Sequence, residues 1–142
     1  MFVTRRAGRE VLLVHRVPEG GGYWHVIAGG VEAGETAVQA AVRELREETG
    51  LEAEIELGLG VTEYVYSLTE EPAERRALHD PSVMAVHVDC FRVEAPNDWE
   101  PTLDAEHDDH RWSSPDEARR VLRWPATANA LDQMLSGTSM AE

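Results

Sequence analysis

Short apolar runs that contain β-branched residues alternate along the chain with polar segments that carry glycine and proline. Runs of this length between turn residues predict buried β-strands. The predicted strands cover residues 1–4, 11–17, 23–27, 53–67 and 82–93, with the first two paired as a hairpin. The polar segments 18–22, 69–81 and 94–102 are predicted to be loops, and 69–81 is expected to be mobile.

Residues 36–50 have the pattern of an amphipathic α-helix. Thr36 is a suitable N-cap, Gln39 completes a capping box, and Gly50 is a suitable left-handed residue at the end. One face is apolar and is expected to pack on the core; it consists of Val38, Val42, Leu45 and Thr49. The opposite face is acidic and carries three glutamates at i, i+3 and i+4, namely Glu44, Glu47 and Glu48.

Two further helices are predicted near the end of the sequence. Ser114 is an N-cap followed by proline, so a short helix should run from there to about Leu122. Another should begin at Trp124-Pro125 and pack on the sheet. Helices that alternate irregularly with strands indicate a single α/β domain over residues 1–136, followed by a disordered tail over 137–142.

The acidic helix face has two interpretations. Like charges at this spacing repel each other by a few tenths of a kcal/mol, roughly, and the helix dipole disfavours anions in this half of the helix. The face is either a solvated charged surface or a site for a cation that prefers oxygen ligands. Mg²⁺ is such a cation, and it commonly bridges carboxylates to substrate phosphates. Spacing alone does not decide between the two.

Composition and charge narrow the class of protein. The chain has 142 residues, 42% of them hydrophobic, which suits one soluble globular domain. Its 27 acidic and 13 basic residues give a net charge of −14, which argues against general nucleic-acid binding because that requires a basic surface. No apolar run approaches the roughly 20 residues of a membrane span. No signal peptide is recognisable, so a cytoplasmic location is expected, and Cys90 is expected to be a buried thiol.

The stretch from Gly29 to Leu51 resembles the signature of the Nudix hydrolase family. Glu35 follows Gly29 after five residues, and the run RELREETGL begins at Arg43 after seven more, so every fixed position is filled. The resemblance implies an α/β/α sandwich around a mixed β-sheet. It also implies an enzyme that uses Mg²⁺, or alternatively Mn²⁺, to hydrolyse a pyrophosphate bond in a nucleotide-type small molecule.

The resemblance assigns roles to individual residues. The implied metal ligands are the Gly29 carbonyl, Glu44, Glu47, Glu48 and Glu106. Either Glu47 or Glu106 is the implied general base, and the sequence does not separate the two roles. An ion pair between Arg43 and Glu35 is expected to support the site.

Three residues are implied to contact the substrate. Arg16 ends a predicted strand and would face the phosphates, although it could simply terminate that strand. Trp24 would lie near the nucleotide, although it could belong to the core. Ala28 stands where many family members have proline, and the lost rigidity should be tolerable.

A downstream acidic segment, LDAEHDDHRW at residues 103–112, also matches the family. The resemblance implies that Glu106 approaches the metal from the side opposite the helix, while Trp112 anchors the segment. The remaining carboxylates, Asp104, Asp108 and Asp109, are expected to be solvated.

The resemblance implies hydrolysis of a nucleoside triphosphate or a related nucleoside diphosphate derivative. Residues 24–45 and the later Trp124 favour the branch of dATP and dihydroneopterin triphosphate pyrophosphohydrolases. ADP-ribose or a sugar nucleotide is the alternative substrate. A non-catalytic Nudix ligand-binding module and a purely structural acidic protein are the alternatives to an enzyme, and both would lack metal-dependent turnover.

Overall fold

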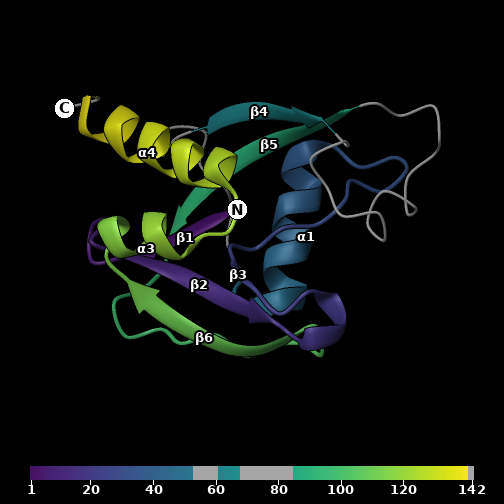
Figure 1. The fold of residues 1–142 in the computed structure, drawn as a ribbon, viewed down its shortest axis with the longest axis horizontal. Helices are drawn as coiled ribbons and strands as arrows, with labels where there is room; N and C mark the ends of the chain where they lie inside the picture. Colours follow the sequence, from purple (N-terminus) through teal and green to yellow (C-terminus); the bar gives the residue numbers. More distant parts are fainter. Residues whose placement is uncertain (53–60, 68–84, 141–142) are drawn as a thin grey trace.

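The computed structural model describes residues 1–52, 61–67 and 85–140, so the predicted loop 69–81 lies outside the described part. Within that part, six strands form one sheet (Figure 1). They are β1 (Phe2–Arg5), β2 (Glu10–Arg16), β3 (Trp24–His25), β4 (Val61–Ser67), β5 (Ala85–Glu94) and β6 (His107–Ser113).

The sheet is mixed, as the family resemblance implies. β1 pairs antiparallel with β2 in the predicted hairpin, with Thr4 opposite Val11. β1 also pairs in parallel with β5, which in turn pairs antiparallel with β4. β6 runs antiparallel along one edge of β2, whereas β1 and β3 share its other edge.

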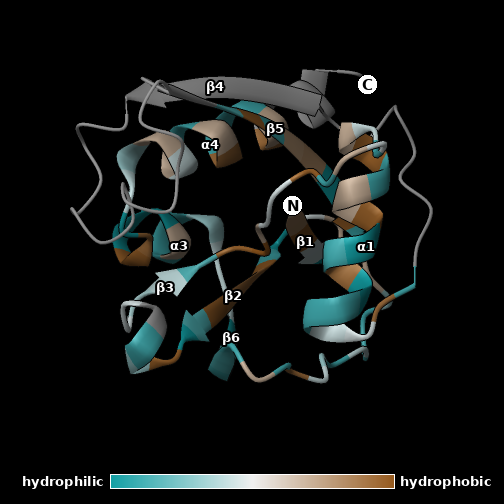
Figure 2. Cartoon of the chain, turned by 90° about the vertical axis from the view of Figure 1, so that its right-hand side faces the viewer, coloured by the Kyte–Doolittle hydropathy of each residue, from teal (hydrophilic) through white to brown (hydrophobic). Residues whose placement is uncertain are grey.

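Helices cover both faces of the sheet, which confirms the predicted α/β/α sandwich. Figure 1 shows α1 (Ala37–Thr49) on one side of the strands, and α3 (Pro115–Val121) and α4 (Pro125–Met140) on the other. Two clusters of buried apolar residues correspond to the two interfaces between the sheet and the helices. One includes Leu45 of α1, and the other includes Leu131 of α4. Figure 2 shows the hydrophobic residues of β2 and β5 between these helices.

The ends of α1 form as the sequence predicts. The Thr36 hydroxyl accepts a hydrogen bond from the Gln39 amide at 3.1 Å, and the Gln39 side chain accepts one from the Thr36 amide at 2.9 Å. Gly50 closes the helix at φ 81°, where a side chain would be strained. These caps set where the helix begins, and therefore which of its side chains reach the site.

Several boundaries differ from the prediction. The predicted strand 23–27 is ordered as strand only at Trp24–His25, because Val26 and Ile27 are buried in opposite core clusters without continuing the ladder. Residues 18–20 of the predicted loop form a 3₁₀ turn. α4 continues to Met140, beyond the predicted domain end at residue 136. None of the helices in the described ranges is long and apolar enough to cross a membrane.

Candidate active site

A cavity of about 1310 Å³ opens between α1, the ends of β2 and β3, the middle of β5 and the start of α4. Ligand pockets commonly measure about 300–1,000 Å³, so a nucleotide would fit here. Most of the predicted site residues line this cavity, namely Arg16, Ala28, Gly29, Arg43, Glu44, Glu47 and Glu106. Side chains that are far apart in the sequence therefore meet in one space.

The bend before α1 (residues 29–36) contains the predicted metal ligand Gly29, and it comes very close to the acidic face of that helix. A Cβ atom added to Gly29 would overlap the carboxylate of Glu44. Any larger residue at position 29 would therefore push the Glu44 carboxylate out of its present place.

Arg43 joins the bend to the helix. Its guanidinium donates two hydrogen bonds to Glu35, at 2.7 and 3.0 Å, which is the predicted ion pair. The same group donates to the Gly30 carbonyl at 2.9 Å, and to Glu44 and Glu47 at 2.9 and 3.2 Å. Hydrogen bonds from Arg43 lower the pKa of Glu35, and in return Glu35 raises the pKa of Arg43. The guanidinium thus offsets part of the repulsion between the glutamates.

The three glutamates of α1 have different environments. Glu47 is 53% exposed, whereas Glu48 is only 2% exposed and faces the core side of the acidic row. Neither carboxylate oxygen of Glu48 has a hydrogen-bond partner among the described residues. Burial, followed by the nearby Glu44 carboxyl, raises the pKa of Glu48 to about 9. A buried carboxylate without partners is costly, so this position favours a bound cation or a proton.

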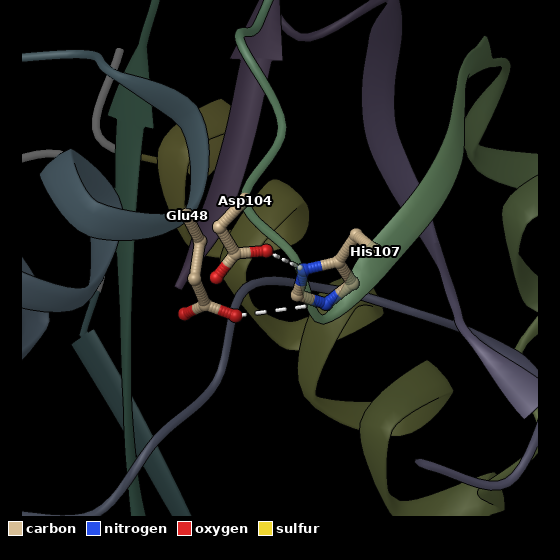
Figure 3. Close-up of side chains that lie close together, drawn as sticks. All are labelled: Glu48, Asp104 and His107. Carbon is tan, nitrogen blue, oxygen red and sulfur yellow. Dashed lines mark hydrogen bonds and ion pairs between the residues drawn. The ribbon is translucent and has the colours of Figure 1, made fainter. Parts of the chain in front are cut away.

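His107 and Asp104 lie beside Glu48, and this corrects the expectation that Asp104 is solvated. Asp104 is half-buried, and its carboxylate lies 2.7 Å from Nδ1 of the buried His107. The other ring nitrogen, Nε2, lies 3.6 Å from Glu48 (Figure 3). Asp104 is drawn inward because a histidine that is only 4% exposed needs a hydrogen-bond partner. The sequence offered one signal, which was the spacing of Asp104 and His107 at i, i+3.

Glu106 is exposed and lines the same cavity as Glu44 and Glu47 of α1. Its carbonyl accepts a hydrogen bond from the Val17 amide at 3.0 Å, which ties the segment to the end of β2 next to Arg16. Trp112 anchors the other end, because its indole donates to Glu100 at 2.8 Å and stacks under Arg5.

Two of the aspartates that follow Glu106 are exposed, as predicted. Asp108 pairs with His15 at 2.7 Å, and Asp109 is also exposed. Neither is among the residues that line the cavity in the described part of the chain. Glu106 thus differs from both aspartates, because it lines the cavity.

Aromatic residues gather at another part of the cavity. Tyr23, His25 and Trp124 line it, and the rings of Tyr23 and Trp124 meet edge to face at 6.2 Å. Trp24 is absent from the described lining and packs on His15 and the α3–α4 core cluster instead. Alternation along β3 explains this, since successive side chains point to opposite faces. The same alternation predicts that Tyr23 and His25 share a face, but it does not tell which face lines the cavity.

Arg16 reaches the cavity with a buried Nε that has no hydrogen-bond partner among the described residues. A guanidinium in this state suits an anionic ligand, because phosphate oxygens accept its hydrogen bonds. The cavity therefore combines carboxylates that suit a divalent cation, one cation that suits a phosphate, and aromatic rings that suit a planar group.

A cavity of this composition on an α/β/α sandwich is the kind of site found in enzymes that act on nucleotides. The profile of the NUDIX domain matches residues 1–134. The CTP pyrophosphohydrolase of Escherichia coli (strain K12) is 34% identical over 137 residues, which are 94% of this chain and 87% of that protein. The chain therefore belongs to the NUDIX family, as the signature predicted, and these similarities support a hydrolase acting on phosphorus anhydrides.

Other similarities concern a longer protein and the fold. An octanoyltransferase of Myxococcus xanthus is 42% identical over 112 residues, which are 78% of this chain but only 28% of that protein. The chain thus spans less than a third of that relative. The solved dihydroneopterin triphosphate pyrophosphohydrolase of E. coli superposes with a TM-score of 0.78 at 21% identity, covering 95% of this chain and 91% of that one. This last match shows a shared fold.

Proposed function

We propose that this chain is a metal-dependent pyrophosphohydrolase that breaks a pyrophosphate bond in a nucleoside triphosphate or a related nucleoside diphosphate derivative. The observation that carries the proposal is that Glu44 and Glu47 of α1 line one cavity together with Arg16 and Glu106. The identity of 34% to a CTP pyrophosphohydrolase supports a nucleoside triphosphate as substrate. The fold shared with the dihydroneopterin triphosphate enzyme is compatible with the branch favoured by the sequence.

The residues of the site fit Mg²⁺ or Mn²⁺. Neither buried oxygen of Glu48 has a hydrogen-bond partner in the described part of the chain, and the absence of a side chain at Gly29 lets the Glu44 carboxylate lie close to the backbone there. The residues that would hold the cation are Glu44, Glu47, Glu48, Glu106 and the carbonyl of Gly29. A bound divalent ion would neutralise phosphate charge and lower the pKa of a water molecule.

The side chains of the chain would perform the remaining steps. Arg16 would bind phosphate oxygens through its Nε, which has no hydrogen-bond partner within residues 1–52, 61–67 and 85–140. Glu106 would accept a proton from the attacking water, because it lines the cavity from a segment outside α1. Glu47 is the alternative base, and it already shares Arg43 with Glu44. Tyr23 and Trp124 would contact the nucleobase of the substrate. We assign this role to them in place of Trp24.

A substrate screen tests this function directly. Nucleoside triphosphates, dihydroneopterin triphosphate, ADP-ribose and sugar nucleotides are incubated with the protein and Mg²⁺, and phosphate products are separated by chromatography. We expect metal-dependent turnover of a triphosphate, abolished by chelator. Turnover of ADP-ribose or a sugar nucleotide alone would show that this compound, and not a nucleoside triphosphate, represents the substrate class. No turnover of any substrate with Mg²⁺ or Mn²⁺ would favour a ligand-binding module.

Glu106→Gln is expected to lower kcat by about 100-fold or more, in the range of general acid–base contributions. It should leave the melting temperature nearly unchanged, because the side chain is exposed. Asp109→Asn removes the same charge three residues away, outside the described cavity lining, and is the matched control. Steady-state kinetics and thermal scans measure both. Full activity of Glu106→Gln with a loss in Asp109→Asn would show that the wrong carboxylate has been chosen.

A further inference from the structure

Three side chains from different segments converge behind the wall of the cavity. Glu48 comes from α1, Asp104 from the loop before β6, and His107 from the first residue of β6 (Figure 3). One ligand atom from each lies within 4.8 Å of the other two. Glu48 and His107 are 2% and 4% exposed, whereas Asp104 reaches the cavity. An ion could therefore enter past Asp104.

The hydrogen bond to Asp104 fixes how His107 faces Glu48. Nδ1 of His107 lies 2.7 Å from the Asp104 carboxylate, so Nε2 is the ring nitrogen that is left to face Glu48. Nε2 lies 3.6 Å from a carboxylate oxygen of Glu48, which is too long for a hydrogen bond. Nε2 and both Glu48 oxygens have no hydrogen-bond partner among the described residues. Two buried polar groups without partners are costly, and a metal ion bound between them would satisfy both.

The distances fit a metal ion in that place. Two ligands bound at about 2.0–2.1 Å to one tetrahedral ion lie roughly 3.4 Å apart, close to the 3.6 Å between Nε2 and Glu48. Histidine ligands of metals usually donate their other ring N–H to a carboxylate, as His107 does to Asp104. Nitrogen donors favour zinc and other first-row transition ions, while Mg²⁺ prefers oxygen.

We propose that Glu48 and His107 bind a divalent transition-metal ion of the Zn²⁺ class, with Asp104 orienting the imidazole. This site is additional to the Mg²⁺ ligands named above, and it rests on the proposed function only in sharing Glu48 with them. A Zn²⁺-class ion bound to His107 would also fix the rotamer of Glu48, because it would hold the carboxylate oxygen that faces the core. The other oxygen of Glu48 would remain directed to the glutamates of the cavity.

The test follows the ring nitrogens of the wild-type protein. The histidines are labelled with ¹⁵N, assigned by through-bond correlation, and followed by NMR during addition of Zn²⁺ and, separately, Mg²⁺. We expect Nε2 of His107 to shift at one equivalent of Zn²⁺ and to remain unchanged with Mg²⁺. A His107 ring that does not respond to Zn²⁺, with the metal bound only by exposed carboxylates, overturns the proposal. So does a ring that shifts only with pH, since a proton then fills the gap.

Variants measure the affinity. His107→Gln and Asp104→Asn should each lower Zn²⁺ affinity by calorimetry by at least 10- to 100-fold. His110→Gln is the matched control, because His110 lies on the same strand and its Nε2 lies 3.8 Å from Glu100. Equal affinity in all three variants would contradict the site. If His107→Gln does not fold, the wild-type spectra decide.

Hydrolysis with Mg²⁺ is assayed on the same samples to separate the two proposals. Turnover without a response of the His107 ring to Zn²⁺ leaves the proposed function intact and removes the second site. A response of the His107 ring to Zn²⁺ without turnover of any substrate would support the second site and contradict the proposed function.

Discussion

Glu47→Gln and Glu48→Gln should each lower kcat by roughly 100- to 1,000-fold, the loss typical of removing one electrostatic contact to a transition state. Both carboxylates belong to the proposed metal ligands, and glutamine keeps their shape while removing the charge that holds a cation. The helix should remain intact, because the Thr36 capping box lies at its other end and the Gly50 cap bonds only to the backbone carbonyl of Arg46. Steady-state kinetics at saturating Mg²⁺ and circular dichroism measure the two effects.

The control for these variants is Glu52→Gln, which removes an exposed carboxylate just beyond the helix. It should retain wild-type kcat, because net charge alone is not responsible for activity. Near-normal turnover in both Glu47→Gln and Glu48→Gln would show that the helix face is a solvated acidic surface, the alternative that the sequence left open. Loss of folding in either variant would instead reveal a structural role.

Glu48→Gln should also stabilise the metal-free protein at alkaline pH. Burial raises the pKa of Glu48 from 4.5 to about 9 in the folded state. Between these two values the unfolded chain releases this proton more readily than the folded chain, so stability falls as pH rises through the window. Below about pH 4.5 both states hold the proton and this contribution is absent. Glutamine resembles the protonated form and removes the loss at higher pH.

At pH 8 with chelator, we expect Glu48→Gln to gain about 1–3 kcal/mol, the usual cost of an unsatisfied buried polar group. For a domain of this size that corresponds to a rise of roughly 3–10 °C in Tm. The gain should shrink toward pH 4.5, whereas Glu52→Gln should show no such trend. Thermal scans between pH 4.5 and 9 measure it. A lower Tm for Glu48→Gln at every pH would mean that the carboxylate makes a stabilising contact.

Local sequence determined the motif helix and most of the secondary structure. Thr36, Gln39 and Gly50 act on neighbouring backbone atoms, so the limits of α1 follow from interactions within a few residues. The same holds for Ser114, whose side chain caps α3 as predicted. The Nudix signature added the mixed sheet and the pair of Arg43 with Glu35. These features depend on short-range spacing or on a long motif, and both can be read from one chain.

The tertiary structure decided how the site residues divide between cavity and core. Periodicity placed Glu48 with Glu44 and Glu47, but only the packing of the segment 104–107 against α1 buried it. The same packing drew Asp104 inward to His107. On β3, pairing with β2 chose which side of the strand faces the cavity, and so favoured Tyr23 over Trp24. Burial and partner choice depend on segments that are distant in sequence, and helical or strand periodicity carries no information about them.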